Sequence, residues 1–437
     1  MKPVRPNRGS TCVSYPRELQ KAIRRFLPAR GLPLQSGDGR VRWTGRLLAV
    51  AALVMVWDSE DLLRDAVASA RRVVVTMYPS RRRPGRSLAG FMNALTRQSD
   101  ALLAAVMASL RGAVPQVAGR HWRPHGWVVM GVDGSRVECP RTAAHEKAFG
   151  CAGKDRTTPQ QLVTVLFHVG TGLLWAWRRG RGDGSERGQL QSMLGLLPEQ
   201  TLLLADAGFT GYALLQGLQD AGHDFIVRVG RGVRLLRKLG YAAKECEGLV
   251  YLWPVRHRPR RPQVLRLVRI ETGRQTVCLL TSVLDASRLS DAAVAQLYRQ
   301  RWGVEVCYRS LKQTLGGRKM RSAGPAAAAA ELDWTLAGLA MLGAMAVESQ
   351  GPRAATPSRW SPARALRTVR RWMDRRWTRR PAGGLRGALR QAVMDAYVRL
   401  GAKAARDWPH KKRQRPPGEP QIRTARRDER LQAKAFH

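Results

Sequence analysis

The sequence predicts an α/β protein: a mixed sheet with flanking helices, an inserted antiparallel β-meander, and helical N- and C-terminal regions. Short apolar runs alternate with helical patterns between residues 127 and 229, which is typical of a sheet covered by helices. At 230–286, further apolar runs follow one another through tight turns with no helix between them. We therefore expect a basic helical region at 1–115, an α/β domain at 116–350 that contains this insertion, and a basic helical region with a tail at 351–437.

The charge of the chain is strongly positive. Its 437 residues include 76 Lys+Arg against 32 Asp+Glu, which gives a formal net charge of +44. An apolar content of 44% is enough to form folded cores and excludes wholesale disorder. A surface of this charge favours nucleic-acid phosphate as the partner, because bound Lys and Arg release condensed counterions. Codon bias toward Arg could supply part of the excess, but it does not explain the scarcity of acidic residues.

The cysteine, histidine and apolar patterns exclude several classes of protein. The six Cys form no CxxC pair and the eight His include no HExxH motif, so no zinc ribbon, disulfide scaffold or zinc protease is indicated. The longest apolar stretch, Trp334–Ala346, is too short to span a bilayer, and residues 1–30 contain no apolar signal segment. We therefore expect a cytoplasmic protein with reduced thiols and no membrane role.

Helical spacing dominates the N-terminal region. Helices are expected near Arg17–Leu27, over Gly45–Val67 and over Ser87–Leu110, the last of which begins at a Ser cap. A basic run, Arg81–Arg86, lies between the second and third of these helices. This region could bind DNA through its Arg side chains, although a helical bundle with a solvated basic face would show the same pattern.

Strand patterns begin after residue 126. Apolar runs that end in Asp or flank Gly-Thr-Gly predict strands, and Ser or Pro marks the ends of helices between them. The expected order is strand, strand, strand, helix, strand, helix, strand, over Trp127–Asp133, Gln161–Val169, Leu173–Arg178, Ser185–Leu197, Thr201–Asp206, Tyr212–Ala221 and Asp224–Val229. Continuous apolar runs such as TLLLA favour central strands that are covered on both faces.

The meander and the C-terminal part follow. The strands of the meander are expected over Leu249–Val255, Gln263–Ile270 and Gln275–Val283. Helices are expected over Asp291–Leu315, Ala326–Glu348, Pro362–Arg380 and Leu385–Ala402. The basic segment after Lys411 is expected to be a flexible arm that binds phosphate.

Two carboxylates occupy positions that suggest chemistry. Asp133 and Asp206 each close an apolar strand and precede a Gly-containing turn, DGS and DAGF respectively. Sites in sheets flanked by helices form at strand ends, and carboxylate oxygens are the ligands that Mg²⁺ and Mn²⁺ prefer. Asp before Gly is also ordinary turn chemistry, and that interpretation suffices for either residue alone. Two such residues on neighbouring strands favour a metal site.

The helix expected over 291–315 presents an acid among cations. Its polar side chains at offsets of 0, 3, 7 and 14 fall within about 60° of arc on one helix face; they are Tyr298, Arg301, Glu305 and Lys312. An acid flanked by cations and a phenol fits a metal ligand beside a polyanion. A solvated helix face with intrahelical ion pairs is the alternative.

These motifs together resemble a known family. The Y-R-E-K signature of the insertion-sequence transposases of the IS-four type matches the residues at 298, 301, 305 and 312. GVDGS around Asp133 and LLLADAGF around Asp206 are similar to the first and second Asp motifs of that family. The long gap from Asp206 to Glu305 resembles the β-rich insertion that such enzymes carry, and the resemblance covers roughly residues 125–320.

The resemblance implies an RNase H-like catalytic core and a DDE transposase that catalyses metal-dependent cut-and-paste transposition of an insertion sequence. End cleavage and strand transfer would proceed by two-metal phosphoryl transfer, with two Mg²⁺ ions and Mn²⁺ as a substitute. The implied catalytic and metal-binding residues are Asp133, Asp206 and Glu305. The implied DNA-binding residues are Tyr298, Arg301, Lys312 and Trp253. Trp253 lies in the insertion and could hold a flipped base, or it could simply pack on a strand face.

The implied partners are double-stranded DNA, as element ends and as target, and a second copy of the chain in a synaptic homodimer. The implied location is the bacterial cytoplasm, in association with the nucleoid. A stand-alone RNase H-like metal-dependent nuclease and a catalytically inactive relative that binds DNA ends are the alternatives. The pairs His145-Glu146 and Glu186-Arg187 could support the site, but surface turns and a helix N-terminus explain them equally well.

Overall fold

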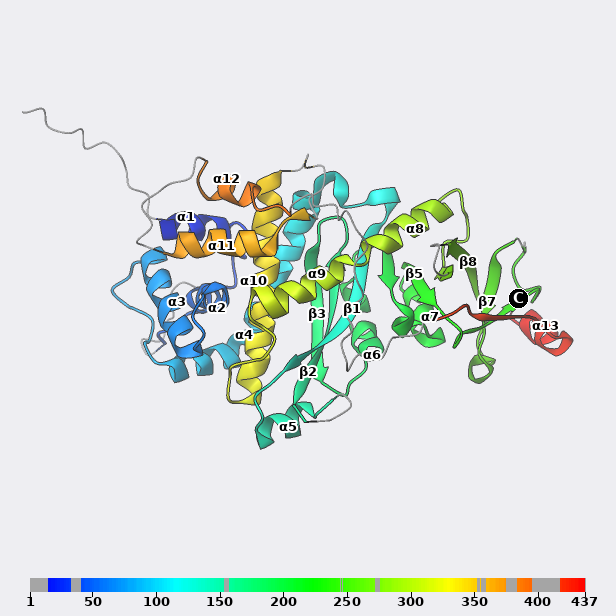
Figure 1. Ribbon diagram of the computed structural model, residues 1–437, viewed down its shortest axis with the longest axis horizontal. Helices are drawn as coiled ribbons and strands as arrows, with labels where there is room; N and C mark the ends of the chain where they lie inside the picture. The colour runs from blue at the N-terminus through cyan, green and yellow to red at the C-terminus, as the bar shows by residue number, and fades with distance from the viewer. Residues whose placement is uncertain are drawn as a thin grey trace, which may run out of the picture. The chain divides into compact units, whose positions relative to one another are not determined.

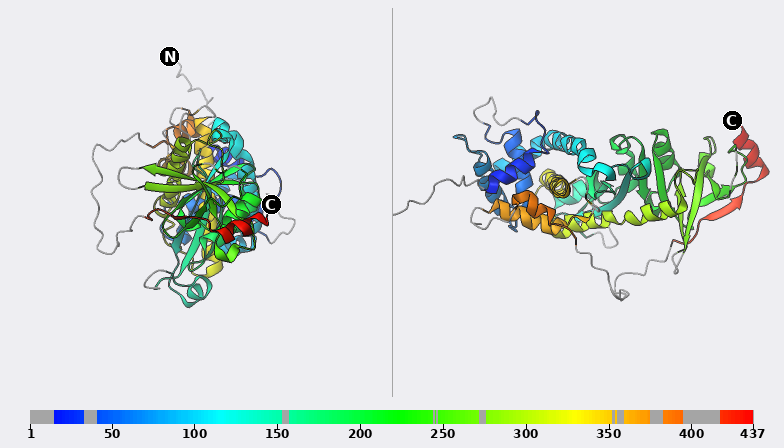
Figure 2. Two further views of the ribbon diagram at one scale, coloured as in Figure 1. Left: turned by 90° about the vertical axis from the view of Figure 1, so that its right-hand side faces the viewer. Right: turned by 90° about the horizontal axis from the view of Figure 1, so that it is seen from above.

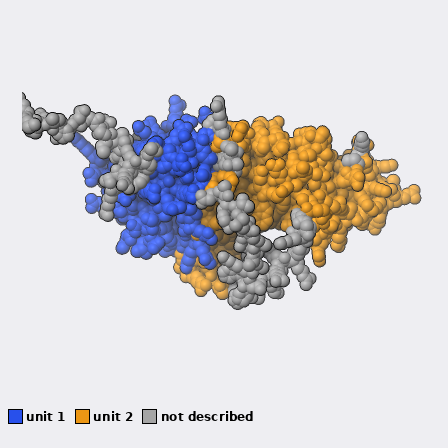
Figure 3. All heavy atoms as spheres, turned by 45° about the horizontal axis from the view of Figure 1, so that its top comes forward, with its two compact units in different colours: residues 1–117, 313–351, 360–393 blue, residues 118–312, 352–359, 394–437 orange. Residues whose placement is uncertain are grey.

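The computed structural model describes most of the chain (Figure 1) and groups it into two compact units. The described residues are 15–32, 41–152, 157–243, 245, 247–271, 276–351, 354, 359–374, 383–394 and 417–436. Unit 1 comprises residues 1–117, 313–351 and 360–393, and unit 2 comprises 118–312, 352–359 and 394–437 (Figure 3).

Unit 1 is helical and is built around one apolar helix. Its helices are α1 (Tyr15–Arg24), α2 (Gly45–Trp57), α3 (Leu63–Met77), α4 (Leu88–Ala118), α10 (Pro325–Gln350), α11 (Pro362–Met373) and α12 (Gly384–Arg390). α10 is apolar on all sides, and α2, α11 and α12 pack against it. A helix without a polar face must be covered all round. This is why α10, which we expected in the domain at 116–350, belongs instead with the N-terminal helices.

Two helical stretches of the described chain are long and apolar enough to cross a membrane by length and composition. They are Leu88–His121 and Pro325–Gln350. The apolar window of the second is 100% buried inside the protein, which is what its place at the centre of unit 1 requires.

The helix expected over Gly45–Val67 is in fact two helices. α2 ends at Trp57, and the chain is extended at Asp58, with φ −63° and ψ 158°. The side chain of Asp58 accepts a hydrogen bond from the backbone N–H of Glu60 at 3.0 Å. This local turn replaces the helical hydrogen bonds and ends the helix. The apolar pattern of the sequence continues past this point, so hydrophobicity alone did not reveal the end of α2.

Unit 2 contains a large mixed sheet. Within the described residues, ten strands form one sheet in the order β10-β6-β7-β8-β9-β5-β4-β1-β2-β3. Their bounds are β1 Val128–Glu138, β2 Gln160–His168, β3 Leu173–Arg181, β4 Thr201–Ala205, β5 Asp224–Val229, β6 Arg234–Arg237, β7 Leu249–Leu252, β8 Gln263–Glu271, β9 Thr276–Thr281 and β10 Gln421–Thr424. The helices of this unit are α5 Ala143–Phe149, α6 Glu186–Gln191, α7 Tyr212–Asp220, α8 Asp291–Gln300, α9 Gly303–Arg309 and α13 Arg427–Lys434.

The half of the sheet that carries the site has the expected topology. β1, β2 and β3 pair antiparallel in sequence order, whereas β4 and β5 add in parallel on the other side of β1. The order β3-β2-β1-β4-β5 with these directions is that of an RNase H-like core, as expected. α6 and α7 connect the parallel strands and contact the sheet, as crossover connections between parallel strands require.

The meander extends this core sheet. β7, β8 and β9 pair antiparallel, as expected, and β9 also pairs antiparallel with β5. Its other edge, β6, pairs in parallel with β10 from the C-terminal segment. The expected flexible arm after Lys411 is therefore corrected over residues 417–436, which form β10 and α13 beside the insertion (Figure 2). The earlier part of that arm and the end of the helix expected over Leu385–Ala402 lie outside the described residues.

A buried carboxylate fastens the C-terminal segment to the insertion. Glu429 of α13 is 3% exposed. It accepts hydrogen bonds from Arg258 Nη2 at 2.6 Å, from Arg423 Nη1 at 2.7 Å and from the backbone N–H of Arg426 at 2.9 Å. The bond from Arg423, followed by these other donors, lowers the pKa of Glu429 to about 2.

We expect Glu429→Gln to free the C-terminal segment and to remove a pH dependence. A carboxyl with a lowered pKa stabilises the fold fully above its ordinary value of 4.5, and this contribution is lost as the pH falls through about 2. Hydrogen exchange of the β10 and α13 amides at neutral pH should report a loss of about 3 kcal/mol, because the largely buried Arg258 loses its charged partner. Glu419→Gln, which removes a half-exposed ion pair with Arg269, should cost below about 1 kcal/mol. Equal exchange in the two variants would contradict the assignment.

Candidate active site

Strand register brings Asp133 and Asp206 together. The parallel pairing of β1 with β4 runs to Gly131 opposite Leu204. Two residues further along both strands, the same register places Asp133 beside Asp206. Asp206 directly follows β4, and its Oδ1 accepts a hydrogen bond from the backbone N–H of Gly208 at 2.8 Å.

Asp133 itself is not at a strand end, which corrects the sequence-based expectation. β1 continues through Asp133 to Glu138, because β2 pairs with it as far as Gln160. The pairing with β2 therefore overrides the turn tendency of Asp-Gly. What ends near Asp133 is the pairing with β4, so one side of the strand is open there.

The surroundings of Asp133 disfavour its charged form. Burial, together with the charges of Asp206 and Glu186, raises the pKa of Asp133 to about 6, against opposing effects of the Gly134 backbone N–H and Arg301. Burial and the charge of Asp206 also raise the pKa of Glu186. Three carboxylates thus share a region of unfavourable negative charge, which a bound cation would relieve.

Glu186 is a member of this cluster to which the sequence assigned no definite role. It is the first residue of α6, after the Ser185 cap, whose side chain accepts from the backbone N–H of Gly188. Its carboxyl group lies against Gly134. A Cβ at Gly134 would come within 2.4 Å of the Cδ and Oε1 atoms of Glu186. The signal in the sequence was a Glu directly after a capping Ser, which also describes an ordinary helix start.

The helix expected over Asp291–Leu315 is broken at the site. α8 ends at Gln300 and α9 begins at Gly303, and residues 310–314 form a π-helix. A Cβ at Gly303 would approach Phe167 of β2 to 3.1 Å, so the close approach of the second segment to the sheet favours Gly here. Arg301 and Trp302 between α8 and α9 keep helical dihedral angles, so the four signature residues lie on consecutive helical segments rather than on one regular helix.

The signature residues occupy different environments. Tyr298 and Arg301 are each 8% exposed, and the guanidinium carbon of Arg301 lies 5.4 Å from the centre of the Tyr298 ring. The charge of Arg301 acts on both Tyr298 and Asp133. Glu305, in contrast, is exposed on α9. The structure thus brings Tyr298 and Arg301 to the two Asp residues and leaves Glu305 in solvent.

Helix α9 is nevertheless fixed along the strand of Asp133. The hydroxyl of Tyr308 lies 2.8 Å from the carbonyl oxygens of Asp133 and Val163. One turn further on, Lys312 Nζ donates to Ser135 Oγ at 2.8 Å. Tyr308 thereby positions α9, which also carries Glu305 one turn earlier in the helix. The sequence did not point to this role for Tyr308. In the sequence, Tyr308 is indistinguishable from a buried aromatic side chain of the core, because its hydroxyl bonds two backbone carbonyls and no charged group.

The donor set has the chemistry of a site for a hard divalent cation. Asp133, Asp206 and Glu186 offer only carboxylate oxygens, and the missing Cβ at Gly134 leaves the space that the Glu186 carboxyl occupies. Among the residues that the structure describes, no three His, Cys, Asp or Glu side chains converge closely enough to hold a metal ion. The residue types fit the ion, and its binding requires these carboxylates to draw together.

Trp253 does not lie in this cluster. It is 2% exposed, its Nε1 donates to the carbonyl of Arg260 at 2.6 Å, and Arg258 covers its ring at 4.2 Å. Phe436 of the C-terminal segment packs on it edge-on. The aromatic side chain that is exposed next to the site is Trp302, at 56%, in the break between α8 and α9.

Comparison with known proteins relates the central part of the chain to transposases. Residues 128–341 match the family model described as the transposase DDE domain. The chain is similar to the transposase InsG for insertion sequence element IS4 of Escherichia coli K12, with 29% identity over 212 residues. That match covers 45% of this chain and 46% of the relative, so it spans about half the length of each.

Among solved structures, the chain is similar to a piggyBac transposase in a synaptic complex with hairpin DNA. The TM-score is 0.37 and the sequence identity is 11%, over 82% of this chain and 77% of the other.

Proposed function

Because this chain belongs to the transposase DDE domain family through residues 128–341, and is similar to the IS4 transposase, we propose that it transposes an insertion sequence by a cut-and-paste route. It cleaves DNA at the element ends and joins the freed 3′-hydroxyl groups to target DNA. The observation that carries this proposal is the β1–β4 register, which supports a shared site for Asp133 and Asp206.

The proposed centre holds divalent ions, Mg²⁺ with Mn²⁺ as a substitute, through Asp133, Asp206 and Glu305. Bound ions there would make a water or 3′-hydroxyl more nucleophilic and neutralise charge on the leaving oxygen. Glu305 must approach the two Asp residues, and the hold of Tyr308 on the Asp133 carbonyl keeps α9 within reach of them.

Arg301 is proposed to hold a phosphate beside this centre. It is nearly buried, and its Nε has no hydrogen-bond partner among the described side and main chains. A buried guanidinium donor without an acceptor matches a phosphate oxygen, which Arg binds by two parallel hydrogen bonds. Tyr298 borders the same space and would contact the DNA backbone. Trp302 is exposed and suited to stacking on a base, whereas Trp253 could do so only after Arg258, which covers its ring, had moved.

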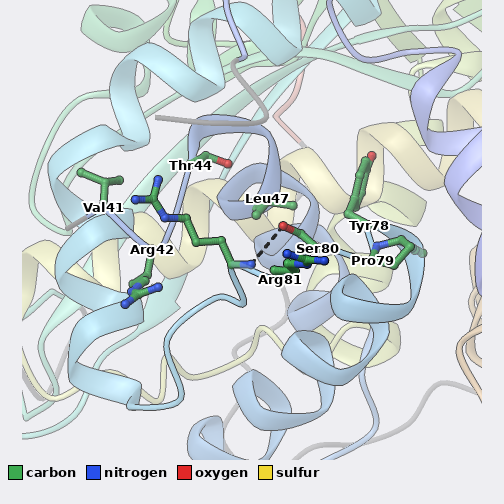
Figure 4. Close-up of a pocket in the computed structure, with 10 residues that line it drawn as sticks. Val41, Arg42, Thr44, Leu47, Tyr78, Pro79, Ser80 and Arg81 are labelled. Atoms are coloured by element: carbon green, nitrogen blue, oxygen red, sulfur yellow. Dashed lines mark hydrogen bonds between the residues drawn. The ribbon is translucent and has the colours of Figure 1, made fainter. Parts of the chain in front are cut away.

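A basic pocket in unit 1 is proposed to bind DNA backbone. It has a volume of about 660 Å³ and includes Arg42, Arg81 and Arg82 among its lining residues, with no acidic residue (Figure 4). Thr44, just before α2, and Tyr78, just after α3, also line it. Phosphate groups neutralise such a surface with release of counterions. The proposed partners are thus double-stranded DNA and a second copy of the chain, because both element ends must be processed together.

Lys312→Ala should weaken DNA binding and make it less dependent on salt. If Lys312 neutralises one phosphate, the slope of log K against log salt should fall by about one unit. Ser135→Ala removes a hydroxyl that accepts from Lys312 but keeps the lysine charge, so it should leave the slope unchanged. Binding isotherms at several salt concentrations measure this directly. An unchanged slope for Lys312→Ala would place Lys312 away from the DNA.

The proposed function is tested with labelled DNA that carries the flanking ends of the gene, with and without Mg²⁺. Metal-dependent nicking at the ends, followed by products joined to a target plasmid, is the expected result. Nicking without joining would instead favour the stand-alone nuclease. Tight binding with no cleavage in Mg²⁺ or Mn²⁺ would favour an inactive relative.

A further inference from the structure

Glu186 is held beside the two Asp residues from both sides. On one side its carboxyl packs against Gly134 of β1, in space that any Cβ would fill. On the other side, its neighbour Arg187 donates from Nε to the carbonyl of Gly208 at 2.6 Å. Gly208 also donates its N–H to Asp206. The start of α6 is therefore tied to the residue after Asp133 and to the loop after Asp206.

The carboxyl of Glu186 has no protein partner that explains this position. Among the described residues it makes no hydrogen bond or ion pair, and Arg136 is the cation that acts on it, at longer range. Asp206 is close enough for its charge to act on the same carboxyl group. Placing a partly buried carboxylate near two others costs free energy unless a cation offsets it.

An ordinary acid at a helix start looks different in the same unit. Glu146 lies in the first turn of α5 after the Thr142 cap and points to solvent. A carboxylate that only complements the helix dipole needs no more than this exposed position. Glu186 is instead half-buried and faces the strand of Asp133.

We propose that Glu186 is a further carboxylate of the metal centre and binds the ions together with Asp133 and Asp206. The proposal rests on the proposed function, because it presumes that divalent ions bind at these strands. It also assigns a role to an acid that stands between the two Asp motifs in sequence, in addition to Glu305 of α9.

The test is Mn²⁺ binding by the full-length protein without DNA, followed through the electron paramagnetic resonance signal of free Mn²⁺. Glu186→Gln preserves size and should weaken Mn²⁺ binding about tenfold or more. Glu146→Gln is the matched control and should bind like the unmodified protein. Thermal unfolding without metal should show Glu186→Gln no less stable than the unmodified protein, because the variant removes a repelling charge.

Gly134→Ala provides an independent variant that keeps Glu186 in the chain. The added Cβ would displace the far end of a flexible side chain, so the fold should tolerate it. The Gly134 N–H that acts on Asp133 is retained. We expect the same weakening of Mn²⁺ binding as in Glu186→Gln.

Asp206→Asn distinguishes a failure of the Glu186 proposal from a failure of the proposed metal centre. If Asp206→Asn weakens Mn²⁺ binding and both Glu186→Gln and Gly134→Ala do not, Glu186 is outside the centre, and its inferred role is wrong while the proposed function stands. If none of the three variants changes Mn²⁺ binding, the metal centre itself is wrongly placed, and both proposals fail.

Discussion

Replacing Asp133 by Asn should lower the rate of DNA end cleavage by on the order of 10³-fold while leaving DNA affinity within about twofold. Asn keeps the shape of the side chain and its place in β1, but it removes a charged oxygen ligand. Loss of metal stabilisation worth several kcal/mol corresponds to such a factor. DNA affinity depends mainly on Lys and Arg, and their number is unchanged. The measurement is single-turnover cleavage of labelled ends, alongside a binding isotherm.

The control for this variant is Asp183→Asn. Asp183 is half-exposed and paired with Arg181 at 3.0 Å in the same unit, so its loss should alter neither quantity appreciably. Because the charged form of Asp133 is disfavoured in the metal-free protein, Asp133→Asn should also not reduce thermal stability without metal. Loss of binding together with stability would show that Asp133 is a structural residue of the strand.

Replacing Glu331 by Ala should destabilise unit 1 by about 3–5 kcal/mol. Glu331 of α10 is 3% exposed. It accepts hydrogen bonds from the backbone N–H of Arg321 at 3.0 Å, from Arg321 Nε at 2.9 Å, and from Ser322 N and Oγ at 2.9 and 2.8 Å. Removing the carboxylate leaves these donors unsatisfied in a buried place, which costs far more than the net strength of each bond. Urea unfolding followed by tryptophan fluorescence measures the change.

Glu348→Ala is the matched control on the same helix. Glu348 pairs with Arg25 at 2.7 Å, but both side chains are partly exposed, at 31% and 56%. Its removal should cost below about 1 kcal/mol. A similar small cost for Glu331→Ala would mean that water replaces the carboxylate, and that the turn before α10 does not depend on it.

The sequence was most informative where local pattern and pairing agree. The apolar runs of β2, β4 and β5 and the helix at 212–220 lie where the pattern predicts them. The RNase H-like order followed from a resemblance carried by a few motifs. The pairing of β9 with β5 and of β10 with β6 could not be predicted, because strands distant in sequence choose partners through packing that no local pattern encodes.

The candidate site was also predictable only in part, because motifs identify residues but not the packing that brings them together. Asp133 and Asp206 were identified from their motifs, although Asp133 was expected at a strand end. Helical spacing placed Glu305 on the face of Arg301, but it did not predict the division between α8 and α9 or the π-helix at 310–314. The Gly at the start of α9, Gly303, is explained by the approach of Phe167, a contact that exists only in the folded chain. In the sequence, Glu186 was likewise indistinguishable from an ordinary residue at a helix start. Its contact with Gly134 is visible only in the structure.

The central claim is that a divalent ion binds where Asp133 and Asp206 meet. Anomalous diffraction from crystals of the full-length protein soaked in Mn²⁺ tests it most directly. We expect a Mn²⁺ peak at about 2.0–2.6 Å from carboxylate oxygens of both Asp133 and Asp206. The claim would be contradicted if crystals soaked in saturating Mn²⁺ showed an anomalous peak elsewhere and none at Asp133 and Asp206.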